Sequence, residues 1–192
     1  MLSAASACVI AVGTNAQTLG TAELVFPNGN TYAGVGAVKV ELWIEFGPEA
    51  FAWATWKGGV SSNDVFASWA SLSSPSYVVV ASPGTPNAGV VNDISVGQVH
   101  FPPIFIANTA NPILIWSAEW STSDLTPRSV LLMPDTHSAK VFIPGGGLEL
   151  VLNDAQASIQ VIPAPPSLAF LALASGLASR RRRARAQGRV FI

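Results

Sequence analysis

The feature that most constrains the fold is a strict alternation of residue types from Val38 to Phe46, in the sequence VKVELWIEF. Every second residue is a large hydrophobe, and Lys39, Glu41 and Glu45 occupy positions between them. Successive side chains of a β-strand point to opposite faces of its sheet, so this pattern is typical of an antiparallel strand with one face on a core and one in water. We therefore predict a strand over this segment.

Similar short runs recur along the chain and are separated by clusters of turn-forming residues. The runs cover residues 22–26, 51–56, 77–81, 94–101, 113–120, 129–133, 140–143, 148–152 and 158–162, with turn clusters at 27–30, 82–84, 111–112 and 145–147. Residues 65–72, VFASWASL, form the one segment of the body with the composition of a short helix. About ten short strands with frequent turns predict an all-β fold, an antiparallel β-sandwich of jelly-roll type, with a barrel as the alternative.

The composition is that of a folded domain with a strong asymmetry of charge. The 192 residues are 49% hydrophobic and only 11% charged, which leaves ample material for a core. Six of the ten basic residues lie in the last thirteen positions, and all eleven acidic residues lie between Glu23 and Asp154. The chain before residue 163 thus carries four basic residues against eleven acidic ones, a difference of −7. This acidic body argues against nucleic-acid binding.

The N-terminus is typical of an exported protein. Residues 2–13 form an apolar, small-residue segment of the length of a secretory h-region, and Thr14-Asn15-Ala16 offers a cleavage site. A basic n-region is missing, so two alternatives stay open: a true start upstream of Met1, or a first strand in place of a signal. We predict a signal peptide over residues 1–16 and a β-sandwich domain over 17–162. Cys8 is the only cysteine, so the mature chain would have no disulfide and no cysteine metal site.

The C-terminus combines prolines, an apolar run and a basic cluster. Residues 168–178 are apolar or small, and Arg180, Arg181, Arg182 and Arg183 follow them closely. At about 1.5 Å per residue, a helix of this run falls well short of the roughly 30 Å hydrocarbon core of a membrane. Such a segment suits transient presentation to a membrane enzyme, with the arginines inside and the body outside. An ordinary single-pass anchor and a core helix with a charged end are the alternatives.

This end resembles the PEP-CTERM sorting signal of Gram-negative bacteria, a Pro-Glu-Pro-like motif followed by a short apolar helix and a basic cluster. The motif here is Pro163-Ala164-Pro165, with alanine in place of the usual glutamate, and residues 184–192 extend past the arginines. The resemblance covers residues 163–192 and implies cleavage near Pro163, Ala164 and Pro165 by an exosortase, a membrane-embedded cysteine transpeptidase. Attachment to the cell surface or release into the extracellular matrix would follow. The departure at Ala164 leaves the subtype of the enzyme open.

The body also resembles the uncharacterised β-rich extracellular domains that often precede such signals. The stretches that carry this resemblance are VKVELWIEFGPEAFAWATW and NPILIWSAEWSTSDLTPRSV. It supports the all-β fold and implies no activity.

The sequence offers no convincing catalytic constellation. His100 and His137 are the only histidines, and the common metalloprotease, serine-hydrolase and phosphate-loop motifs are missing. A triad of His137 with Asp135 and a serine stays open, although the surrounding PDTHS has the composition of a turn. Glu41 and Glu45 lie roughly 13 Å apart along one strand face, too far for a pair of glycosidase carboxylates. We expect no enzyme activity and no cofactor.

Three Asn-Asp pairs, at residues 63–64, 92–93 and 153–154, fall at predicted strand ends. Ca²⁺ requires about six to eight oxygen ligands, and Asn and Asp supply them in exported acidic proteins. The same residues are common turn formers, and none of the pairs matches a calcium-loop motif. We therefore predict turns and no metal site.

Trp43 is the candidate ligand platform, because the alternation places it on the polar face of its strand. An exposed indole on a flat sheet suits stacking on a sugar ring; alternatively a second layer, a loop or a partner covers it, which is the commoner fate of tryptophan. Trp116 and Trp120 share the alternation of Leu114 and are predicted to lie in the core, as is Trp53.

Two functions from different classes follow. The first is an exported cell-surface or matrix protein, processed by an exosortase, transiently anchored in the membrane by its C-terminus, and carrying a body of structural role. The alternative is a binding module of the same fold, with an extracellular polysaccharide or another partner bound near Trp43. A hydrolase is the remote alternative.

We predict that replacing Arg180, Arg181, Arg182 and Arg183 with alanine removes the positive flank that holds the C-terminus inside, which leaves a mislocalised or unprocessed precursor. The mass of the protein recovered from its host measures this, because it reports both cleavages. Replacing Lys57 and Lys140 of the body with alanine is the control and should leave processing unchanged. A four-arginine variant that is sorted and cleaved like the parent would contradict the prediction.

Overall fold

The computed structural model describes residues 18–98, 100–101, 105–106 and 108–163. Within these ranges every regular element is a strand, and no helix there has the length and apolarity needed to cross a membrane. The predicted signal peptide, the C-terminal helix and the arginine cluster lie outside the described residues, as do Ala164 and Pro165. Pro163 is the last described residue and is exposed.

The described part of the chain contains ten strands of five or more residues, close to the number predicted, although the predicted runs at 129–133 and 140–143 belong to one strand. They are β1 (Thr18–Val25), β3 (Val38–Phe46), β4 (Ala52–Ser62), β5 (Ala67–Ser73), β6 (Val79–Asn87), β7 (Val90–Gly97), β10 (Ile113–Thr122), β11 (Arg128–Ile143), β12 (Gly146–Asp154) and β13 (Ala157–Val161). Three strands of two residues are β2 (Thr31–Tyr32), β8 (His100–Phe101) and β9 (Phe105–Ile106). The most regular alternation in the sequence coincides with β3, which begins and ends where it was predicted.

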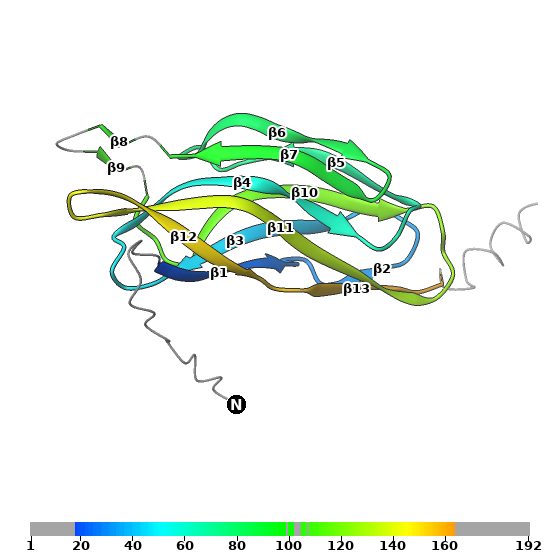
Figure 1. Cartoon of the computed structure of the whole chain (residues 1–192). Helices are drawn as coiled ribbons and strands as arrows, with labels where there is room; N and C mark the ends of the chain where they lie inside the picture. The colour runs from blue at the N-terminus through cyan, green and yellow to red at the C-terminus, as the bar shows by residue number, and fades with distance from the viewer. Residues whose placement is uncertain (1–17, 99, 102–104, 107, 164–192) are drawn as a thin grey trace, which may run out of the picture.

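The strands form two packed layers (Figure 1). One layer has the order β5-β10-β3-β1, and the other has the order β12-β11-β4-β7-β6. The layers are joined at one side because β1 pairs in parallel with β12, from Thr18 opposite Leu150 to Ala22 opposite Asp154. β13 pairs with the first part of β11 and, in parallel, with β2. The other described pairs are antiparallel, so the predicted antiparallel β-sandwich is confirmed, with two parallel contacts that alternation alone does not reveal.

Indole rings dominate the core between the layers. Trp53, Trp56, Trp116 and Trp120 are completely buried, which confirms the predicted burial of three of them. Trp120 makes an edge-to-face contact with Tyr32 at a centroid distance of 5.6 Å. Trp116 donates its Nε1–H to the carbonyl oxygen of Pro83 across the sandwich (3.0 Å), so it ties β10 to β6, the edge strand of the opposite layer.

A β-bulge in β10 corrects one predicted face. The pairing of β10 with β3 shifts between Leu114 and Trp116, and both Ile115 and Trp116 are buried. An extra residue in a strand reverses the face of every residue on one side of it. Leu114 therefore lies on the outer face, opposite Trp43, and the prediction that it shares a face with Trp116 is wrong.

Two further predictions fail because pairing between strands overrides local composition. Residues 67–73 form β5 and not a helix, since buried Ala67 and Trp69 alternate with exposed neighbours as the strand pairs with β10. The predicted turn at residues 82–84 lies within β6, at the edge of its sheet. Proline is tolerated at such an edge because no ladder hydrogen bond is lost on the open side.

The PDTHS segment is also a strand and not a turn, because it lies inside β11. A bulge occurs between Thr136 and Ser138, where β11 pairs with β4. The hydroxyl of Thr136 accepts the Nε1–H of buried Trp56 (3.0 Å) and donates to Asp154 Oδ1 (2.6 Å), while its backbone N–H donates to Asp154 Oδ2 (2.8 Å). These bonds connect β4, β11 and β12 at one point.

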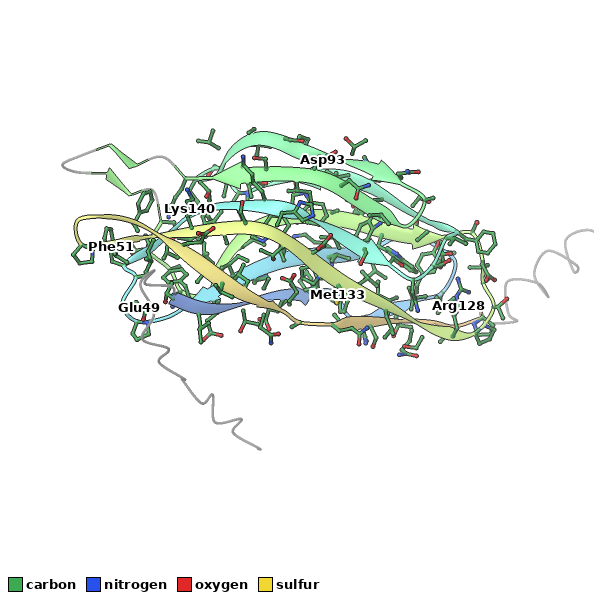
Figure 2. All side chains as sticks on the ribbon, viewed as in Figure 1. Glu49, Phe51, Asp93, Arg128, Met133 and Lys140 are labelled. Carbon is green, nitrogen blue, oxygen red and sulfur yellow. The ribbon has the colours of Figure 1, made fainter. Side chains whose placement is uncertain are left out.

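An ion pair between the half-buried Arg128 and the buried Asp64 fastens the end of the sandwich that bears Arg128 in Figure 2. Arg128 Nη2 lies 2.6 Å from Asp64 Oδ2, whose side chain is only 2% exposed. The Arg128 guanidinium also donates to the carbonyl oxygens of Asp124 and Thr126. Asp64 Oδ1 accepts the backbone N–H of Phe66, so the predicted turn at residues 63–64 is confirmed and is held by this network.

Candidate functional site

Trp43 lies near the middle of β3, on the outer face of the β5-β10-β3-β1 layer. Its inward neighbours Leu42 and Ile44 are completely buried, whereas Trp43 is half-buried. In the register of the sheet, Trp43 is opposite Glu23 of β1 on one side and Leu114 of β10 on the other. The indole thus lies between a carboxylate and an aliphatic side chain. Its role as a binding platform stays a prediction.

The Trp43 indole is bonded to a carboxylate that a lysine holds in turn. Its Nε1–H donates to Glu41 Oε2 (3.2 Å), and Glu41 Oε1 lies 2.7 Å from Lys39 Nζ. The three residues occupy alternate positions of β3 and therefore share one face. Glu41 is only 8% exposed although it lies on the outer face of the sheet. The carboxylate is thus held between its two neighbours, which restricts the indole to one orientation.

Three further carboxylates surround this group. Glu23 and Glu45 are exposed on β1 and β3, and Glu119 is exposed on β10 opposite Lys39. Glu119 Oε2 accepts a hydrogen bond from Ser71 Oγ (2.7 Å). Among the described residues, none of these three carboxylates forms an ion pair with a basic side chain. We call Lys39, Glu41, Trp43, Glu45, Glu23, Glu119 and Leu114 the Trp43 face.

The edge of the Trp43 face at Leu114 is held by Tyr77, in the segment between β5 and β6. The Tyr77 hydroxyl donates to the carbonyl oxygen of Leu114 (2.8 Å). Burial raises the pKa of Tyr77 above its usual 10, and a hydrogen bond with Asn108 opposes this in part. The neutral phenol is therefore the form that holds β10 in place, and this contribution is lost as the pH rises through the raised pKa.

The outer face of the opposite layer does not assemble the proposed triad. His137 Nε2 lies 3.3 Å from Asp135 Oδ2, but their side chains are 62% and 67% exposed. No serine hydroxyl among the described residues bonds to His137, and the side chain of His100 lies outside the described part of the structure. A pair that is open to solvent lacks the enclosure in which a catalytic histidine is usually positioned. Glu41 and Glu45 lie on the outer face of β3, where Glu41 bonds to Trp43 and Lys39 and Glu45 is exposed.

Nothing in the described chain gathers the ligands of a metal ion: no group of three or more His, Cys, Asp or Glu residues is placed to bind one there. The Asn-Asp pairs have separate structural positions. Asn92 and Asp93 lie within β7, where Asp93 adopts a positive φ of 58°, so the predicted strand end is wrong for this pair. Asp154 ends β12 and accepts the two hydrogen bonds from Thr136.

A shallow apolar hollow lies at the end of the molecule marked by Phe51 in Figure 2. It is lined by Phe51, Phe142, Ile143, Pro144, Gly145, Gly146 and Gly147. The rings of Phe51 and Phe142 stack at a centroid distance of 6.3 Å. No charged side chain lines the hollow, so it offers little to specify a ligand.

Comparison with known proteins identifies the fold. A scan against protein-family models found no model that matches, and a search of curated proteins found no match. The structure is similar to the cohesin module of a family 33 glycoside hydrolase from Clostridium perfringens, with a TM-score of 0.56 and 12% sequence identity over 76% of this chain and 98% of the cohesin. It is also similar to the seventh ScaB type I cohesin of Pseudobacteroides cellulosolvens, with a TM-score of 0.55 and 11% identity over 78% and 94% of the two chains.

At such low identities the likeness shows the fold alone. The described chain is thus a β-sandwich module with the fold of cohesins, and its site must be inferred from its own residues. The sequence indicated Trp43, Glu41 and Glu45, which lie on one strand. It did not indicate Glu23 or Leu114, because their positions depend on strand pairing and on the bulge in β10.

We predict that Trp43→Ala lowers the free energy of unfolding by about 1–2 kcal/mol, because only part of the indole is removed from water. Trp120→Ala is the matched comparison and should cost about 3–5 kcal/mol, since it empties a fully buried position. Denaturant unfolding of the two variants measures both. A loss for Trp43→Ala as large as that for Trp120→Ala would mean that Trp43 is a structural residue and not a surface platform.

Proposed function

We propose that this chain is an exported protein whose β-sandwich is a non-catalytic module that binds a protein partner through the Trp43 face. The observation that carries the proposal is the half-buried indole of Trp43, fixed by Glu41 at the centre of an outer sheet face. Tryptophans supply much of the binding energy at protein interfaces, and an indole that is ordered before binding loses little entropy on contact.

The cohesin fold supports a modular role. The similar Clostridium perfringens structure is a module within a glycoside hydrolase, so this fold occurs as a separate unit of larger proteins. The predicted export and exosortase sorting would place such a module at the cell surface or in the matrix. A structural role in the matrix is compatible with binding, because a displayed module attaches to the matrix through its partner.

Three lysines allow the binding face to be identified. Lys39 lies on the Trp43 face and its side chain is 45% exposed. Lys57 and Lys140 lie on the outer face of the opposite layer, since each follows a buried residue of β4 or β11. Acetylation of lysine amines by a small reagent therefore reports both faces in one sample.

We predict that the secreted proteins of the host protect Lys39 of the full chain from acetylation, while Lys57 and Lys140 stay reactive. The Trp43→Ala variant should lose this protection, because the partner loses its central contact. Peptide mass spectrometry measures the three sites. Protection by the host's polysaccharide fraction instead would make the module a carbohydrate binder. Protection of Lys57 and Lys140 alone, or none at all, would contradict the proposed function.

A further inference from the structure

We infer that the partner presents an extended basic segment, with one arginine or lysine over the Trp43 indole and between Glu23 and Glu45. This inference rests on the proposed function and names the chemistry of the partner. It follows from the charge of the Trp43 face, from the places of its carboxylates around the indole, and from the direction of β3.

The Trp43 face carries an excess of acidic residues, as the whole body of the chain does. It holds Glu23, Glu41, Glu45 and Glu119 against Lys39 alone, a net charge of −3. Lys39 is already paired with Glu41. The other three carboxylates lack a basic partner among the described residues. A basic partner would supply the missing counter-charges, whereas an acidic one would be repelled.

The carboxylates are positioned to act together with the indole. Glu23 of β1 is directly opposite Trp43 of β3 in an antiparallel pair. Two residues in this relation have their Cβ atoms about 4.5–5.5 Å apart. Glu45 is two residues further along the same face of β3, roughly 7 Å away. A guanidinium group stacks on an aromatic ring while the edges of its plane donate to carboxylates. Glu41 accepts the Nε1–H of the indole and holds it in place.

Other ligand classes fit this face less well. An apolar partner would cover Glu23, Glu45 and Glu119 without replacing the water that solvates them, which is costly for charged groups. A neutral sugar can stack on Trp43 and donate its hydroxyl groups to the carboxylates, but it leaves their charge uncompensated. A cation satisfies the ring and the carboxylates at once.

The spacing of the face also predicts the spacing of the basic residues. Glu119 is opposite Lys39 in the register of β10 and β3, and Lys39 is four positions before Trp43. Along an extended chain, four residues span roughly 13 Å. A segment lying along β3 would therefore place a second basic residue at Glu119, four residues from the one at Trp43.

The test uses a nine-residue Gly/Ser peptide with arginines at positions 3 and 7, and the full chain. We expect the Glu23→Gln, Glu45→Gln double variant to weaken binding of the peptide about tenfold, because it loses two charge contacts. Trp43→Ala should also weaken it about tenfold, because it loses the cation–aromatic contact. Glu149→Gln, on β12, is the matched control and should bind like the parent. A peptide with citrulline in place of arginine should not bind measurably, and salt should weaken the parent's binding.

Equal binding of the citrulline peptide, equal loss in Glu149→Gln, or no loss in the double variant would overturn the inference. The lysine acetylation experiment tests the proposed function independently of this peptide experiment. If secreted proteins protect Lys39 in a Trp43-dependent way but the basic peptide does not bind, the module binds a partner of other chemistry. If Lys39 is never protected, the proposed function itself falls, whatever the peptide does.

Discussion

The packing of buried indoles between the two layers is the interaction on which the rest of the structure depends. Trp53, Trp56, Trp116 and Trp120 are completely buried, and the Nε1–H groups of Trp56 and Trp116 reach partners on other strands. Large rings that fill the space between two sheets fix which residues of each strand face inward. The outer face of β3, with Trp43 at its centre, is a consequence of this inner packing, because the alternate residues have no place in the core.

The sequence predicted the structure correctly where the residue pattern of a single strand determines which side chains face the core. β3 matched its prediction because its inward residues are uniformly large and its outward ones mostly charged. Prediction failed where the structure depends on contacts between distant segments. The bulge at Leu114, the strand at Thr136 and the parallel pairing of β1 with β12 all arise from partner strands, which local composition does not encode. Glu23 was missed as a neighbour of Trp43 for the same reason.

The proposed site differs from an ordinary solvated strand face in the arrangement of its charges. Opposite charges face one another in the register of several strands, as Glu149 of β12 does with Lys140 of β11 and Glu119 of β10 with Lys39 of β3. On the Trp43 face, Lys39 forms its ion pair with Glu41, which bonds to the indole, and no ion pair of Glu23, Glu45 or Glu119 occurs among the described residues. The proposed binding surface thus uses exposed carboxylates, whereas the carboxylate of Asp64 is buried and paired with Arg128.

The most direct test of the central claim, that the Trp43 face is the binding face, is a map of backbone amide chemical shifts when the partner is added. We expect the largest changes in β1, β3 and β10, centred on Trp43, with the outer face of β4, β7 and β11 unchanged. Changes confined to β4, β7 and β11 would contradict the claim and would place the binding surface on the opposite layer.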